Sequence, residues 1–179
     1  MVDPSYDASS ALRFIKSKSL ILEYIINTHH HSDHTNDNQR VKNESNCRII
    51  ASASGGQQLA EKVDKVVEDG DELQLGEVKL KFMLTPGHTP DGLCIIVDNE
   101  AIITGDTLFI GDCGRCDLPG SNLAQMFNSL QNKIKPLPDH LIVYPGHDYG
   151  PKPFDTLGNQ KKINKTLRAR SLEEFSRIP

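Results

Sequence analysis

The stretch "LILEYIINTHHHSDHT" (residues 20–35) joins an almost wholly apolar segment to a cluster of histidines. Residues 20–28 are apolar or favour β-structure, which is the pattern of a buried strand. In an extended segment His29 and His31 point to one side and His30 to the other, while Asp33 and His34 follow after a turn. Imidazole and carboxylate groups at this density indicate a metal site that accepts zinc, iron or manganese.

The same arrangement recurs further along the chain. An apolar run ends, the chain turns at glycine or proline, and a candidate ligand follows: His88 after "FMLTPG", Asp106 after "AIITG" and His147 after "LIVYPG". Groups on such turns at the carboxyl ends of strands are well placed to converge at one rim of a sheet. A carboxylate can bridge two metals, and Asp106 is the natural candidate. For His30 and His140 an ordinary surface or turn role is sufficient.

Hydrophobic periodicity predicts a mixed α/β chain. Helices are expected at 9–19, 55–62 and 123–134 and in two short pieces over 157–178, and strands at 20–28, 47–52, within 64–88, and at 92–99, 101–106 and 140–148. The strands within 64–88 are expected to be consecutive and antiparallel. Those at 92–99 and 101–106 are expected to form a hairpin that turns at Asn99 and Glu100. The polar stretch 36–46 is expected to be an irregular helix or a loop.

Length and composition predict one cytoplasmic domain over residues 1–179. No apolar run approaches the about 20 residues that a membrane helix needs, and the first residues do not resemble a secretory signal. The net charge of −4 disfavours nucleic acid as a partner. With four cysteines in a chain of this length, a disulfide framework is not expected. Cys113 and Cys116 form a C-x-x-C pair that we interpret as two reduced loop cysteines rather than a redox site.

The H-x-H-x-D-H motif, followed by "PGHTP", "GDTLF" and "PGHDYG" in that order, resembles the metallo-β-lactamase superfamily over nearly the whole chain. The resemblance implies an αββα sandwich with two divalent metal ions at one edge, with zinc as the first expectation and iron or manganese as alternatives. It implies one site at His29, His31 and His88, a second at Asp33, His34 and His147, and Asp106 as the bridge. A metal-bound hydroxide would be the nucleophile, with Asp33 as the catalytic residue that orients it.

The segments "GDTLFIGDCGRCDLPG" and "YPGHDYG" resemble the glyoxalase II and persulfide dioxygenase branches, which act on glutathione derivatives. Residues that match Arg115 and Tyr149 lie against the glutathione portion in those branches. An arginine fork can hold a carboxylate by two parallel hydrogen bonds, and a tyrosine hydroxyl can add a third. The alternative for Arg115 is a structural ion pair within its loop.

Three functions remain open from the sequence. The first is hydrolysis of a small-molecule thioester such as S-2-hydroxyacylglutathione by two metals. The second is oxidation of glutathione persulfide by one iron held by the residues matching His29, His88 and Asp106, a two-histidine, one-carboxylate triad. The third is a truncated relative that binds metal but turns over poorly. No membrane partner is expected, and the oligomeric state is left open.

Two departures from glyoxalase II bear on these functions. Only residues 151–179 follow Gly150, so the helical C-terminal domain of glyoxalase II is expected to be absent. The segment "MVDP" resembles the end of an early strand that relatives reach after a β-hairpin, and this chain is expected to lack that hairpin. Its loss would expose an edge of the sheet.

Overall fold

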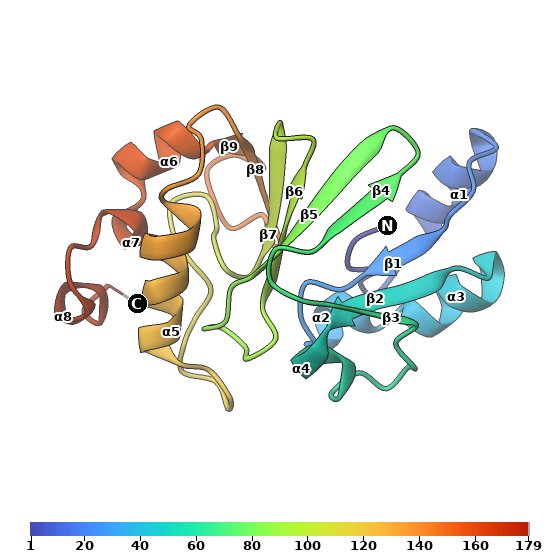
Figure 1. Cartoon of the computed structure of the whole chain (residues 1–179), viewed down its shortest axis with the longest axis horizontal. Coiled ribbons are helices and arrows are strands. Elements are labelled where there is room, and N and C mark those ends of the chain that lie inside the picture. Colours follow the sequence, from blue (N-terminus) through green and yellow to red (C-terminus); the bar gives the residue numbers. More distant parts are fainter. Residues whose placement is uncertain (179) are drawn as a thin grey trace. The chain divides into compact units, whose positions relative to one another are not determined.

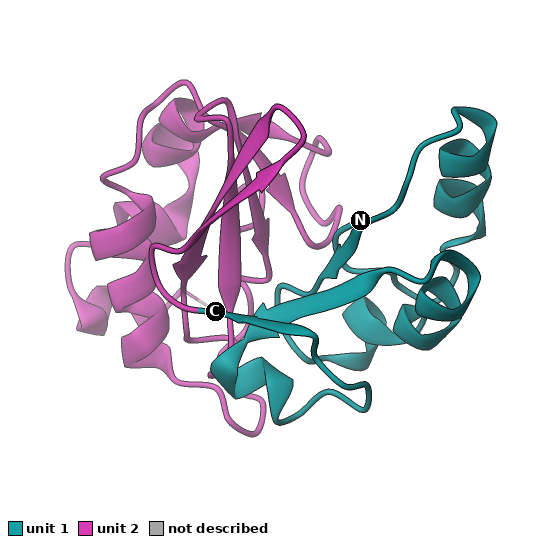
Figure 2. Cartoon of the chain, turned by 45° about the vertical axis from the view of Figure 1, so that its right-hand side comes forward, with its two compact units in different colours: residues 1–67 teal, residues 68–179 magenta. Residues whose placement is uncertain are grey.

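The computed structural model describes residues 1–178, and the chain divides into two compact units, Met1–Val67 and Glu68–Pro179 (Figure 2). Each unit combines one sheet with helices, so the predicted mixed α/β class is confirmed. Within residues 1–178 we find no helix with the length and apolar character that crossing a bilayer requires. One domain over residues 1–179 stays a prediction.

Unit 1 holds a three-stranded sheet of order β1-β2-β3, in which both neighbouring pairs are parallel (Figure 1). Its strands are β1 (Tyr24–Ile26), β2 (Arg48–Ser52) and β3 (Lys65–Val67). Its helices are α1 (Ser9–Ser17), α2 (Ser32–Thr35), α3 (Asn38–Ser45) and α4 (Ala53–Gly56). Val2 forms an isolated parallel bridge to Ile26, so the "MVDP" segment lies beside β1 as the end of an early strand would.

The core of unit 1 forms between the sheet and its helices. Ile25 of β1 and Ile49 of β2 pack with Val41 of α3, and all three side chains are fully buried. Burial of an aliphatic side chain contributes about 1.5–3 kcal/mol, so these three residues fix α3 to the sheet. Asn46 caps the C-terminus of α3: it takes a left-handed conformation and its amide donates to the Lys42 carbonyl.

Unit 2 holds a six-stranded sheet of order β4-β5-β6-β7-β8-β9. Its strands are β4 (Glu72–Leu75), β5 (Val78–Leu84), β6 (Leu93–Val97), β7 (Ala101–Gly105), β8 (Ile142–Pro145) and β9 (Asp155–Thr156). All neighbouring pairs are antiparallel except β7 and β8, which are parallel. It follows that β5, β7 and β8 run in one direction and end at the same edge of the sheet.

The helices of unit 2 gather on one face of this sheet (Figure 1). They are α5 (Leu123–Asn128), the π-helical η1 (Ser129–Ile134), α6 (Leu157–Ile163), α7 (Lys165–Arg168) and α8 (Leu172–Phe175). Met126, Leu130 and Ile134 are fully buried and pack in one cluster with the strand residues Ile96 and Ile102. The predicted helical spacing over 123–134 is thus confirmed, although its second half is π-helical.

Several predicted elements differ in the structure. The helix expected over 55–62 is wrong: only the single turn α4 forms, and it ends at Gly56, where two adjacent glycines lower the stability of a longer helix. The strand expected over 20–28 is shortened to β1, and the side chain of Ile21 is 88% exposed. Strand β3 pairs in parallel with β2, not in the antiparallel meander expected for residues 64–88.

Smaller differences lie at the turns and the tail. The chain turns between β6 and β7 over Asp98–Glu100; Asp98 and Asn99 have positive φ, and the Glu100 amide donates to the Val97 carbonyl. The strand expected last, β8, is followed by the short β9. The tail forms three short helices instead of two, and Ser171 caps the last of them through the Glu174 amide, as its sequence indicated.

Candidate metal centre

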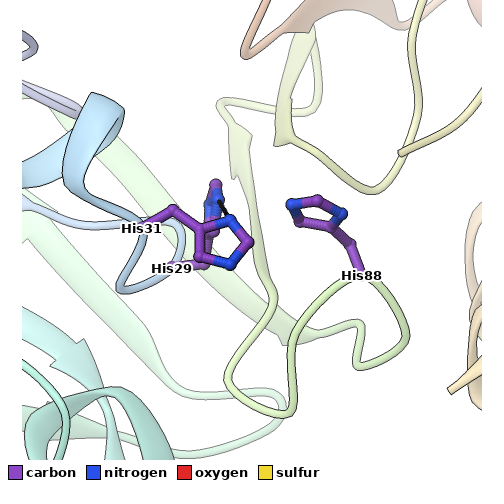
Figure 3. Close-up of side chains that lie close together, drawn as sticks. All are labelled: His29, His31 and His88. Atoms are coloured by element: carbon purple, nitrogen blue, oxygen red, sulfur yellow. Dashed lines mark hydrogen bonds between the residues drawn. The ribbon is translucent and has the colours of Figure 1, made fainter. Parts of the chain in front are cut away.

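The candidate ligands of unit 1 follow β1. The strand ends at Ile26, and the one-turn helix α2 reverses the chain directly after His31. Figure 3 shows His29 and His31 on the loop between β1 and α2, with their rings turned toward one another. Nε2 of His29 lies 3.2 Å from Nδ1 of His31, so the two ring nitrogens are close enough to face one metal ion. His30 is half-buried and packs edge-on against His31.

Asp3 orients the histidines of unit 1 and was not among the residues predicted from the sequence. Its Oδ2 atom lies 2.9 Å from Nδ1 of His34 and 2.6 Å from the Thr28 hydroxyl, and that hydroxyl lies 3.1 Å from Nδ1 of His29. The pattern assigns a proton to Nδ1 of both histidines and a lone pair to Nε2. A carboxylate behind a histidine is the usual support of a metal ligand. Asp3 directly follows Val2, whose single bridge to Ile26 lies beside β1 but leaves no hydrophobic pattern in the sequence.

Asp33 and His34 form the second pair in unit 1. Both belong to α2, and Oδ2 of Asp33 lies 3.8 Å from Nε2 of His34. His34 is buried, whereas Asp33 is partly exposed. The two side chains therefore present one oxygen and one nitrogen to the same region, which suits a divalent cation.

The three candidate ligands of unit 2 follow β5, β7 and β8, which end at one edge of the sheet. His88 lies in the loop after β5, as Figure 3 shows. Oδ2 of Asp106 lies 3.5 Å from Nε2 of His88 and 3.5 Å from Nε2 of His147. Gly105 precedes Asp106 with φ 47° at an irregularity of the β7–β8 ladder, and this turn directs the carboxylate out of the strand. One carboxylate thus stands between two imidazoles.

The ring of His88 is fixed from its other side. Its Nδ1 atom donates to the Arg115 carbonyl over 2.8 Å, which leaves the lone pair on Nε2, the atom that faces Asp106. Imidazole nitrogens with oriented lone pairs and carboxylate oxygens at 3.5–3.8 Å are thus present in both units. This donor set fits divalent zinc, iron or manganese.

The two predicted substrate-binding residues are both on the surface of unit 2. The guanidinium of Arg115 donates to both carboxylate oxygens of Asp117, at 2.5 and 2.6 Å, and this raises the pKa of Arg115 and lowers that of Asp117. The ring of Tyr149 stacks on His147 with centroids 4.8 Å apart. Phe109 packs edge-on against both rings. Tyr149 is therefore placed beside a candidate ligand, while Arg115 already has an anionic partner.

The C-x-x-C cysteines are reduced and poorly suited to redox chemistry. All four cysteines of the chain are free thiols. Burial raises the pKa of Cys113, and it raises that of Cys116 to about 11. Since a reactive cysteine needs a lowered pKa, these thiols support the interpretation as structural loop residues.

Comparison with known proteins places these features in a family. The sequence model of the Metallo-beta-lactamase superfamily matches residues 1–147. Hydroxyacylglutathione hydrolase of Rhodospirillum rubrum is 34% identical over 174 residues, covering 97% of the chain and 66% of the relative, so the chain spans just under two thirds of that protein. The mitochondrial persulfide dioxygenase ETHE1 of Bos taurus is 32% identical and covers 99% of the chain and 69% of the relative.

A solved structure matches equally broadly. The crystal structure of ETHE1 from Myxococcus xanthus superposes with a TM-score of 0.89 at 29% identity, over 97% of the chain and 76% of that protein. ETHE1 proteins are therefore among the similar proteins both by sequence and by fold.

Proposed function

The chain belongs to the metallo-beta-lactamase superfamily and has its α/β fold, and we propose that it is a metal-dependent hydrolase that cleaves a thioester such as S-2-hydroxyacylglutathione. The observation that carries this proposal is the position of Asp106, whose Oδ2 atom is 3.5 Å from the imidazoles of both His88 and His147. A carboxylate between two ligand sets is what a bridge between two cations requires. Two cations favour hydrolysis over one-metal oxygen chemistry.

We assign the ligands of both units to one centre. The order of the motifs along the chain and the family match over residues 1–147 support this assignment. In it His29, His31 and His88 would hold the first cation, Asp33, His34 and His147 would hold the second, and Asp106 would serve both. Zinc is the proposed metal. Iron and manganese are alternatives, because nitrogen and oxygen donors accept all three metals.

The chain's own residues then have defined tasks. Bound divalent cations would lower the pKa of water to about 7 and polarise the thioester carbonyl. Asp33 would accept a hydrogen bond from the attacking water and orient it. Arg115 and Tyr149 would hold a carboxylate of the substrate, with Arg115 exchanging its bond to Asp117 for one to the substrate. Asp3 would keep the His34 ring in its binding orientation.

Oxidation of a persulfide is the second candidate. It is favoured by the relative named persulfide dioxygenase, which matches 99% of the chain. One iron held by His29, His88 and Asp106 would leave open positions for oxygen and sulfur. His31, Asp33, His34 and His147 would then surround the iron without binding it.

Metal analysis combined with two substrates separates the candidates. The protein is purified in parallel with zinc and with iron supplied, and its metal content is measured per chain. We expect two metals per chain and anaerobic cleavage of an acylglutathione thioester. One iron per chain with oxygen uptake on glutathione persulfide, and no thioester cleavage, would establish the dioxygenase instead.

A further inference from the structure

The turn Leu84–Gly87 leads from β5 to His88, and hydrogen-bond donors on other segments of unit 2 hold it in place. Three of its carbonyls are bound by the segment 122–133: that of Leu84 by Lys133 Nζ at 2.8 Å, that of Pro86 by the Ser129 hydroxyl at 2.7 Å and that of Gly87 by the Asn122 amide at 2.7 Å. Thr85 is held by a hydroxyl contact of 2.8 Å to Thr107, the neighbour of Asp106. The place of His88 is therefore set by other elements of unit 2.

Lys133 also fixes the end of β5. Its ammonium lies 2.9 Å from Oδ2 of Asp69, while Oδ1 of Asp69 accepts the Leu84 amide over 2.8 Å. The ion pair of Lys133 and Asp69 thus binds both backbone groups of Leu84: Asp69 accepts from its amide, and Lys133 donates to its carbonyl. A charged donor makes a stronger bond to a carbonyl than a neutral one does, so the last residue of the strand is firmly held.

The turn also lies directly against the helix backbone. Gly87 has φ 153°, and a Cβ atom at this position would collide with the backbone of Met126. Only glycine permits this approach. A side chain at residue 87 would therefore force the His88 turn and the helix apart.

The donors Ser129 and Lys133 both belong to η1, the π-helical part of the segment. The amide of Lys135 bonds to the Leu130 carbonyl, five residues back, as in a π-helix. Such segments are rare, and they are frequently found at functional sites. Ser129 is completely buried, and its hydroxyl donates away from its own helix to the turn.

From these contacts we propose that Ser129 and Lys133 are positioning residues that set the place of the His88 imidazole. The inference rests on the proposed function in one respect, namely that His88 binds a metal. Two sets of hydrogen bonds fix the His88 ring. Ser129 and Lys133 of η1 bind the turn that precedes it, and Nδ1 of the ring donates to the Arg115 carbonyl. A shift of the turn would move Nε2 away from Asp106 Oδ2, which lies 3.5 Å away.

The variant Ser129→Ala tests this role, with Ser121→Ala as its matched control. The Ser121 hydroxyl also donates to a carbonyl over 2.7 Å, but its acceptor is Leu118, outside the His88 turn. We expect Ser129→Ala to weaken zinc binding about tenfold in competition with a chelator, which is the usual effect of removing support from a ligand. We expect Ser121→Ala to bind zinc as the wild type does.

A measurement on metal-free protein distinguishes the positioning role of Ser129 and Lys133 from the proposed metal-dependent function. In metal-free protein, NMR signals of the His88 ring nitrogens and hydrogen exchange of residues 84–89 report the turn directly. We expect Ser129→Ala to shift the ring signals and accelerate exchange, while Ser121→Ala changes neither. If the wild type binds no metal but these signals change, the proposed function fails and the positioning role stands.

Lys133→Met gives a second variant in case Ser129→Ala does not fold, since it removes the ammonium and keeps most of the side-chain length. The same changes in ring signals, exchange and zinc affinity are expected. Unchanged signals and unchanged zinc affinity in a folded Ser129→Ala or Lys133→Met protein would overturn the proposal.

Discussion

The two sets of candidate ligands are built in different ways. In unit 1 they lie close together in the sequence, between residues 29 and 34, and a side-chain carboxylate, that of Asp3, orients their rings. In unit 2 they lie far apart, between residues 88 and 147, and backbone turns and a helix orient them. The first set depends on one local segment and one acceptor. The second depends on the order and direction of strands.

This difference predicts different responses to substitution. A change in unit 1 should act through a single side chain. A change in unit 2 should act either at the carboxylate of Asp106, which we propose as the bridge, or through the scaffold that brings three strand ends together. The four expectations that follow run from the largest effect to the smallest.

Asp106→Asn should have the largest effect, because Asp106 faces both His88 and His147. If Asp106 bridges two cations as proposed, its loss would remove several kcal/mol of support for them, which corresponds to about a thousandfold loss of thioester hydrolysis. Metal content should fall below two per chain in the same sample. A variant that retains two metals and full activity would contradict the bridging role.

Asp3→Asn should lower metal affinity by about 10- to 100-fold, because the carboxylate that accepts from His34 and Thr28 loses its charge. Chelator competition measures this effect. Asp7→Asn is the matched control, since Asp7 is an exposed carboxylate of the same unit that bonds to Ser9 and Arg40. Equal metal affinity in the two variants would mean that Asp3 does not support the ligands.

Acid should weaken the scaffold of unit 2 through Asp155. Burial raises the pKa of this carboxyl, but hydrogen bonds from Lys152, Asn159 and Gln160 outweigh burial and lower it to about 2, from an ordinary value of 3.8. Since the folded pKa lies below the unfolded one, the stabilisation of about 2 kcal/mol is complete above pH 4 and is lost as the pH falls toward 2.

Urea unfolding of the wild type and of Asp155→Asn at a series of pH values measures this contribution. The two proteins should differ by about 2 kcal/mol at pH 6 and converge near pH 2. A constant difference across this range would show that the carboxylate charge is not the cause.

Arg115→Ala should have the smallest effect, because Arg115 is exposed and already paired with Asp117. We expect KM for an acylglutathione to rise by a few fold to about tenfold, with kcat nearly unchanged. Asp117→Asn should lower KM, since it removes the competing anion. If neither variant changes KM, Arg115 serves only as an ion pair of its loop.

Much of the candidate site could be predicted because each group of candidate ligands begins after an apolar strand. His29 after β1, and His88, Asp106 and His147 after β5, β7 and β8, were all identified by this rule. Asp3 was missed because its strand is reduced to a single bridge at Val2, which carries almost no hydrophobic pattern.

The fold was less predictable where local preference is weak. Parallel pairing of β3 with β2 depends on the path of residues 53–64, and periodicity does not report strand direction. The π-helical turn over Ser129–Ile134 keeps its apolar residues at helical spacing, so it cannot be distinguished from an α-helix by pattern. Within it, Ser129 and Lys133 bond to the His88 turn, a tertiary contact that the spacing of apolar residues does not report.

The distribution of the free cysteines has a practical use. Cys47 is buried in unit 1, whereas Cys94 and Cys113 are buried in unit 2. A thiol that is buried reacts with an alkylating reagent only after the structure around it opens. Pulsed alkylation followed by mass spectrometry would therefore time the opening of each unit separately in the unaltered protein. Added zinc should slow both reactions if the two sets of ligands hold the same metals.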